Sequence, residues 1–130
     1  MGLFETFAIS GSGLTAERMR LDLIASNLAN ANTTNPAGES PFQRQLAFFQ
    51  TQLQAGGVRL AGIVKDAAPP RLVFDPAHPH ANAEGYVAFP NINPINEMVD
   101  MMAASRAYEA NLTALSSGKE LFLRALGILQ

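Results

Sequence analysis

The sequence predicts a mainly α-helical protein, in which long N- and C-terminal helices form an antiparallel-type coiled coil with a small β-rich insert between them. Apolar residues recur in alternating steps of three and four over the last third of the chain, and the same spacing recurs near its start. The intervening segment contains Pro, Gly and short β-branched runs. We therefore expect an N-terminal helical arm at residues 1–34, an insert at 35–93 and a long helix at 94–130.

The C-terminal helix carries the longest repeat. It is apolar at every step except Ser105 and Lys119, and no Pro interrupts it. Its positions are Met98, Met101, Ser105, Tyr108, Leu112, Leu115, Lys119, Phe122 and Leu126. A helix of this length runs about 50 Å, whereas a globule of this size has a radius of gyration of only about 14 Å. The apolar seam of this helix therefore needs a partner.

The N-terminal helix has a matching seam. Its positions are Leu3, Phe7, Ser10, Leu14, Glu17, Leu21, Ile24 and Leu28, with polar interruptions only at Ser10 and Glu17. Glycines at 11 and 13 weaken the helix, since each costs about 1 kcal/mol relative to Ala. Taken alone, this segment favours a core helix of a compact bundle over a coiled-coil arm. The similar pitch of the two seams favours pairing of the two helices.

Local signals set the helix boundaries. The asparagine-rich residues 30–35 favour an unwinding helix end, and Pro36 prevents its continuation. At the start of the C-terminal helix, Asn93 or Asn96 is a suitable N-cap, and Pro94 fits the first helical position after Asn93.

The insert is predicted to hold three short strands, at residues 58–65, 71–74 and 86–89, which form a small sheet or hairpin. Residues 42–53 fit either a helical face or a buried strand. So few short strands do not fold robustly alone. We therefore expect the insert to lean on the helices.

The overall composition excludes several classes of protein. A net charge of −2 with scattered arginines argues against a nucleic-acid partner. The absence of Cys excludes a disulfide framework and a thiol nucleophile. No apolar run is long enough for a transmembrane helix. The N-terminus has neither a basic region nor an uninterrupted apolar region, so we expect any export to proceed without a cleaved signal peptide.

The sequence contains few candidates for a catalytic or metal-binding site. Asp75, His78 and His80 are the only clustered metal-type ligands, and a turn with two exposed imidazoles explains them as well. No Gly-x-Ser-x-Gly nucleophile motif and no phosphate-binding loop is present. We predict no catalytic residue, no cofactor, no metal and no small-molecule substrate. The seams instead predict self-association.

Three motifs resemble a known family. Residues 21–34 are similar to the N-terminal motif of flagellar rod and hook axial proteins, and residues 96–111 are similar to their C-terminal motif. Residues 75–79 together with 85–87 resemble the signature of the proximal rod branch, the FlgC type. The residues that carry the resemblance are Asn27, Asn30, Asn32, Thr33, Asp75, Pro76, His78, Pro79, Gly85, Tyr86, Glu97, Arg106 and Asn111.

The resemblance implies a structural subunit of the flagellar basal-body rod, the tubular drive shaft that crosses the periplasm and transmits torque. It further implies export through the flagellar type III apparatus and terminal helices that stack with neighbours to line a channel. The implied partners are further copies of the chain, other rod proteins, and the base of the rod at the membrane ring and export apparatus.

In one place the sequence departs from the family. The family pattern carries two adjacent basic residues after the N-terminal motif, and this chain keeps only Arg44. The resemblance favours an extended conformation for residues 42–49.

We therefore predict that both seams contribute to an assembly interface. Three rival functions stay open: another axial flagellar subunit, either a different proximal rod protein or a distal one, an amphipathic module on a membrane surface, and an enzyme that uses the loop at 75–80.

Overall fold

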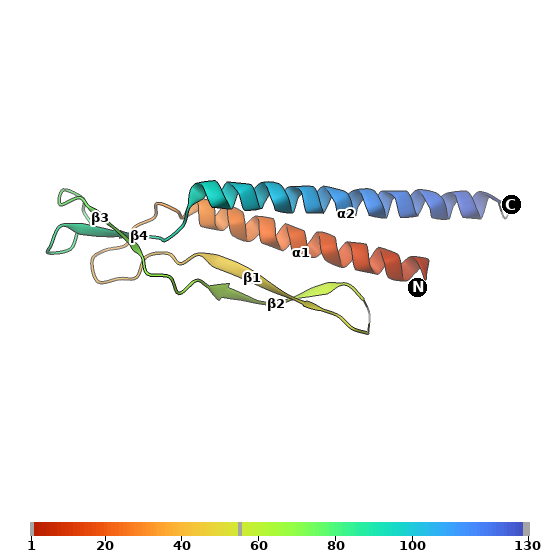
Figure 1. The fold of residues 1–130 in the computed structure, drawn as a ribbon, viewed down its shortest axis with the longest axis horizontal. Helices are drawn as coiled ribbons and strands as arrows, with labels where there is room; N and C mark the ends of the chain where they lie inside the picture. Colours follow the sequence, from red (N-terminus) through yellow and green to blue (C-terminus); the bar gives the residue numbers. More distant parts are fainter. Residues whose placement is uncertain (1, 55, 129–130) are drawn as a thin grey trace.

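The computed structural model describes residues 2–54 and 56–128. They form α1 (Leu3–Ala29), β1 (Gln45–Thr51), β2 (Val58–Lys65), β3 (Arg71–Phe74), β4 (Tyr86–Phe89) and α2 (Pro94–Ile128). The molecule is elongated, with α1 lying between α2 on one side and the β1–β2 hairpin on the other (Figure 1). The β3–β4 hairpin lies beyond the end of the helix pair at which α2 begins (Figure 1).

The prediction of two long terminal helices around a small β insert is confirmed. The helices hold 27 and 35 residues and run antiparallel, because Phe4 lies against Phe122 while Asn27 lies against Glu97. The three predicted strands are present at residues 58–65, 71–74 and 86–89, but the expectation that they form one small sheet or hairpin is wrong. The insert contains four strands in two separate antiparallel hairpins, β1–β2 and β3–β4.

Residues 42–53, ambiguous in the sequence, contribute strand β1. It pairs with β2 from Gln45↔Lys65 to Thr51↔Val58, with a register shift between Phe48 and Phe49. The β1–β2 hairpin is fastened to α1 at two points. Ser12 Oγ accepts the Val58 N–H at 3.0 Å, and the Asn27 amide binds the backbone of Gln45. These anchors are 15 residues apart, about 22 Å along the helix.

The turn before β2 needs glycine. Gly56 and Gly57 have φ of 69° and 82°, values that favour glycine. A Cβ on Gly57 would lie 2.2 Å from Ser12 Oγ, and one on Gly56 would lie 2.9 Å from Ile9 Cδ1. The backbone of the turn therefore rests directly on α1.

The β3–β4 hairpin contributes to the small core beyond the helix ends. Arg71↔Phe89 and Val73↔Val87 are paired on one face, and Val87 is completely buried. Ala31 and Ile92, from the segments that follow α1 and precede α2, are also buried. This core therefore lies where the segment after α1, strand β4 and the segment before α2 meet, and it is not the interior of a single sheet.

The predicted end of the first helix and start of the second are confirmed, and the predicted end of the second helix at residue 130 lies outside the described residues. α1 ends at Ala29, and α2 begins at Pro94, where Asn93 Oδ1 accepts the Ile95 N–H at 3.0 Å. Asn93 is therefore the N-cap of α2, with Pro94 at the first helical position.

Candidate assembly interface

The face of α2 that packs on α1 follows a regular heptad spacing with small and polar residues on alternate steps. Gly118 faces the Phe7 ring, and the Asn111 side chain lies over Gly13. The residues of this inner seam are all buried or half-buried: Glu97, Met101, Ala104, Tyr108, Asn111, Leu115, Gly118 and Phe122. Small residues at the contact allow the two helix backbones to approach closely.

The predicted α2 seam coincides with the inner seam only at every second position. Met101, Tyr108, Leu115 and Phe122 are shared. The prediction that the alternate residues also face the N-terminal helix is wrong for Met98, Leu112 and Leu126, which are 55%, 45% and 44% exposed. Lys119 is exposed and Ser105 half-buried. The true alternate positions are Glu97, Ala104, Asn111 and Gly118, one residue earlier in each case.

The predicted α1 seam is covered within the chain, and its contribution to an assembly interface stays a prediction. Ile24 is buried, and the other described members are half-buried: Phe7, Ser10, Leu14, Glu17, Leu21 and Leu28. The side chain of Leu3 lies outside the part that the structure describes. On another face of α1, the Arg20 guanidinium sits 5.7 Å from the centre of the Phe49 ring in β1. α1 is therefore covered by α2 and by β1–β2.

The base of the helix pair holds a buried polar junction that links three elements. Asn27 of α1 donates to the Gln45 carbonyl at 3.0 Å and to Glu97 Oε2 at 3.2 Å, and it accepts the Gln45 N–H at 2.9 Å. Asn27 and Glu97 are each 1% exposed. Arg44 donates from Nε to Glu97 Oε1 and from Nη2 to Asp100 Oδ2, the latter at 3.3 Å.

Both oxygens of the buried Glu97 carboxylate have partners in this junction. The Glu97 carboxylate lies in the first turn of α2, where the helix dipole favours a negative charge. A buried carboxylate without a partner is costly, and Arg44 with Asn27 satisfies both of its oxygens. The arrangement contains paired charges and saturated amides rather than a nucleophile beside a base. Its chemistry is that of a joint that fixes β1 against both helices.

The loop that connects β3 to β4 is built by its own hydrogen bonds. The His78 Nδ1 accepts the His80 N–H at 3.0 Å, and Thr34 Oγ1 lies 2.8 Å from His80 Nδ1. Both imidazoles are half-buried, so the expectation that they are exposed is wrong. Among the described residues, no group of three His, Cys, Asp or Glu side chains could hold a metal ion. His80 ties this loop to the end of α1.

The other family-motif residues are spread over the molecule. Asn30 Nδ2 donates to the Ser26 carbonyl at 2.9 Å, and Thr33 Oγ1 donates to Asn30 Oδ1 at 3.3 Å, so both cap the end of α1. Gly85 has a φ of 84°, and a Cβ there would meet Phe74 and Pro76. The remaining motif residues are exposed: Asn32, Asp75, Pro79, Tyr86 and Arg106. The motif therefore marks joints of the fold as well as surface positions.

Sequence reasoning missed the role of Arg44 and Gln45. Arg44 is the single basic residue kept after the N-terminal motif, which was the available signal. In the sequence, Glu97 stands out only as one of the residues that carry the family resemblance. The ion pair between Arg44 and Glu97 spans 53 positions in the sequence, so no local pattern reveals it.

Within the described residues, no helix is both long and apolar enough to cross a membrane.

Comparison with known proteins defines the class first. Residues 7–36 match the family model described as "Flagella basal body rod protein". Residues 83–128 match the model described as "Flagellar basal body rod FlgEFG protein C-terminal". The two matches cover most of α1 and all of α2, and they place the chain among the flagellar rod proteins.

Full-length relatives then narrow the family. The chain is 41% identical to the flagellar basal-body rod protein FlgC of Borreliella burgdorferi, over 100% of this chain and 99% of that protein. It is 45% identical to FlgC of Yersinia enterocolitica, over 97% of each, and 38% identical to FlgC of Bacillus subtilis, over 98% and 99%. The chain belongs to the FlgC family of flagellar basal-body rod proteins, which confirms the resemblance of its motifs.

Proposed function

We propose that this chain is a non-enzymatic building block of the flagellar rod, which assembles through its terminal helices into a tubular shaft that crosses the periplasm and transmits torque. One observation carries the proposal. The chain exposes 8899 Å², whereas a compact monomer of 13.9 kDa exposes about 6,700 Å². The excess of about 2,200 Å² reflects the elongated shape, and it is large enough to supply one partner's share of a permanent interface, about 1,000–2,500 Å².

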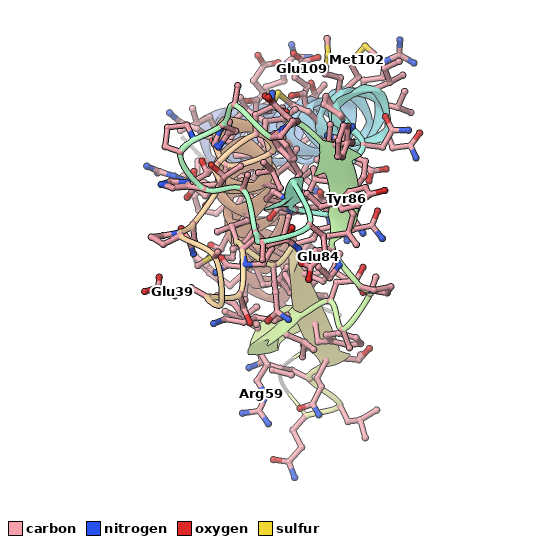
Figure 2. All side chains as sticks on the ribbon, turned by 90° about the vertical axis from the view of Figure 1, so that its left-hand side faces the viewer. Glu39, Arg59, Glu84, Tyr86, Met102 and Glu109 are labelled. Carbon is pink, nitrogen blue, oxygen red and sulfur yellow. The ribbon has the colours of Figure 1, made fainter. Side chains whose placement is uncertain are left out.

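Much of this excess area is apolar and lies on α2. Met98, Val99 and Met102 are 55%, 54% and 55% exposed. These residues begin an outer stripe that faces away from α1, and Met102 projects from the outer side of α2 in Figure 2. The outer stripe consists of Ile95, Met98, Val99, Met102, Leu112, Leu123 and Leu126. Burial of each such side chain contributes about 1.5–3 kcal/mol.

Neighbouring subunits provide the natural cover for this stripe. In this proposal α1 and α2 form a coiled coil whose outer residues contact the helices of adjacent subunits around a channel. A heterologous contact that does not close on itself generates a helical tube. The predicted interface residues that do not face α1, including Leu112 and Lys119, then become contacts between subunits.

The proposed partners are further copies of the chain, other rod proteins, and the base of the rod at the membrane ring and export apparatus. Delivery to the periplasm proceeds through the flagellar type III apparatus without a cleaved signal peptide. The names of the relatives support the rod location. The remaining steps rest on the resemblance of the terminal motifs.

The test is complementation of a strain that lacks its own FlgC. Leu112→Asp places a charge on the outer stripe, and we expect it to abolish motility and rod assembly. Ser117→Asp adds the same charge at an exposed polar position of α2 and serves as the matched control. Both purified variants should retain the helical circular dichroism of the unmodified protein. Normal motility with Leu112→Asp would overturn the proposal.

The rival assignment to another axial subunit is tested in parallel. The chain should restore motility to a strain that lacks FlgC and fail to restore it to strains that lack other rod proteins. Restoration of a different rod mutant would favour that rival.

A further inference from the structure

The C-terminal end of α2 extends past the start of α1. Phe4, in the first turn of α1, lies opposite Phe122, with ring centroids 6.1 Å apart. Residues 123–128 continue α2 beyond that point, about 9 Å of helix. Leu121 and Ile128 are seven residues apart and therefore on the same side of the helix, and they are 64% and 85% exposed. We call residues 121–128 the overhang.

The opposite end of the molecule carries a second uncovered apolar surface. Leu72, Phe74 and Tyr86 are 61%, 63% and 42% exposed. Phe74 and Tyr86 are directly paired across β3–β4, with ring centroids 5.3 Å apart in an edge-to-face arrangement. Leu72 lies two residues from Phe74 and therefore on the same side of the strand. We call this surface the hairpin face; the opposite face of β3–β4 is the one that buries Val87.

We propose that the overhang of one copy of this chain docks along the hairpin face of a second copy, so that subunits join end to end. This inference rests on the proposed function and specifies one of its contacts. Figure 1 shows the two surfaces at opposite ends of the long axis. A contact between them is heterologous, and it leaves one free surface of each kind for the next copy.

The two surfaces match in size. The overhang has eight residues, and at 1.5 Å per residue it is about 12 Å long. Each strand of the hairpin face has four residues, and at 3.4 Å per residue it is about 13 Å long. A single helix segment of this length covers the Phe74–Tyr86 pair and its apolar neighbours.

The charges at the two ends are complementary. Arg124 lies within the overhang and is 78% exposed, with only a weak ion pair to Glu120 at 3.8 Å, and Lys119 precedes the overhang. Asp75 and Glu84 are both exposed beside the hairpin face. Figure 2, which views the molecule from this end, shows Glu84 close to Tyr86. Cations at one end therefore meet carboxylates at the other when copies stack in one direction.

The Cys-free sequence makes the contact testable by disulfide cross-linking of two purified single-cysteine variants. Arg124→Cys and Glu84→Cys are mixed and oxidised. Arg124→Cys with Glu39→Cys is the matched control, because Glu39 is an exposed acid at the same end but on another side of the molecule (Figure 2). We expect the Arg124–Glu84 pair to give several-fold more heterodimer than the control.

Sedimentation equilibrium of the unmodified protein and of Leu121→Glu provides the second readout, because Leu121 belongs to the overhang and not to the outer stripe. We expect Leu121→Glu to weaken self-association at least tenfold, about 1.4 kcal/mol, while Ser117→Glu leaves it unchanged. Equal cross-linking of both cysteine pairs would overturn the inference. So would a chain that stays monomeric at every concentration, or an Arg124→Cys variant that cross-links in cells only to a different rod protein.

The two proposals fail separately. If the end-to-end cross-link is absent while Leu112→Asp still abolishes motility, the rod function stands and this contact is wrong. If the cross-link forms while Leu112→Asp cells swim normally, the proposed role of the outer stripe is wrong.

Discussion

Arg44 and Glu97 form an ion pair in which the carboxylate is almost completely buried while the guanidinium stays a quarter exposed. The pair joins the residue that precedes β1 to the first turn of α2, and Asn27 of α1 binds the other carboxylate oxygen. Three elements that are distant in the sequence therefore depend on one buried negative charge.

Removal of Arg44 should destabilise the protein strongly, because it leaves the buried Glu97 carboxylate without its cationic partner. We expect Arg44→Met to lower the free energy of unfolding by about 3 kcal/mol, the lower end of the range for a broken buried pair. Urea unfolding followed by circular dichroism measures the change. The double variant Arg44→Met with Glu97→Met should recover part of the loss, since it removes the charge as well. Arg59→Met, at an exposed arginine of β2, is the control, and an equal effect in both arginine variants would contradict the role of the junction.

Asn27 should hold β1 against the helices. Asn27→Ala leaves Glu97 and the Gln45 backbone without their amide partner, and each lost buried hydrogen bond costs about 1–3 kcal/mol. We expect hydrogen exchange to accelerate at Gln45–Thr51 more than in the middle of α2. Asn32→Ala, at an exposed asparagine, should leave exchange unchanged. Unaltered protection of β1 in Asn27→Ala would show that the strand is held by other contacts.

Glycines of the helices should respond differently to alanine. A Cβ on Gly11 meets nothing within 4 Å, whereas one on Gly118 would lie 2.9 Å from the Phe7 ring. Gly11→Ala should therefore stabilise the protein by about 0.5–1 kcal/mol through helix propensity. Gly118→Ala gains the same helix propensity, but the added methyl group displaces the Phe7 ring, so we expect no net rise in stability. Thermal unfolding of the two variants compares them, and an equal rise in Tm would argue against close packing at Gly118.

The contact between Thr34 and His80 should fix the β3–β4 loop to the end of α1. Thr34→Val keeps the side-chain shape but removes the hydroxyl, and we expect a loss of about 1 kcal/mol. The effect should appear as faster amide exchange at residues 78–81, with β1 unaffected. Thr51→Val, at an exposed threonine at the end of β1, provides the comparison. If the two variants behave alike, the hydroxyl of Thr34 has no specific role.

The sequence predicted the two helices, the end of α1 and the start of α2, because these features are local. Apolar spacing marks a helix, and Asn93 with Pro94 marks its start. It did not predict the register of α2 on α1. Local pattern selects the most apolar spacing, Met98 and Leu112, whereas the structure uses Glu97 and Asn111.

Those polar residues can occupy the inner seam only because of residues far away in the sequence. Arg44 neutralises Glu97, and Gly13 leaves room for the Asn111 side chain. The number of hairpins was missed for a related reason. Residues 42–53 have an ambiguous period, and their extended form is fixed by β2 and by anchors on α1.

The antiparallel pairing of α1 with α2 has a consequence for how the chain acquires its structure. Asn27 binds Glu97, which follows 70 positions later in the sequence. Phe4 packs on Phe122, which lies near the other end of the chain. Contacts of such sequence separation close late, since the loop entropy is lost before the contact is gained. Until residues 94–128 are available, α1 has only the β1–β2 hairpin to cover it. A chain threaded through a narrow conduit with its N-terminus first would therefore stay open until its final segment emerged.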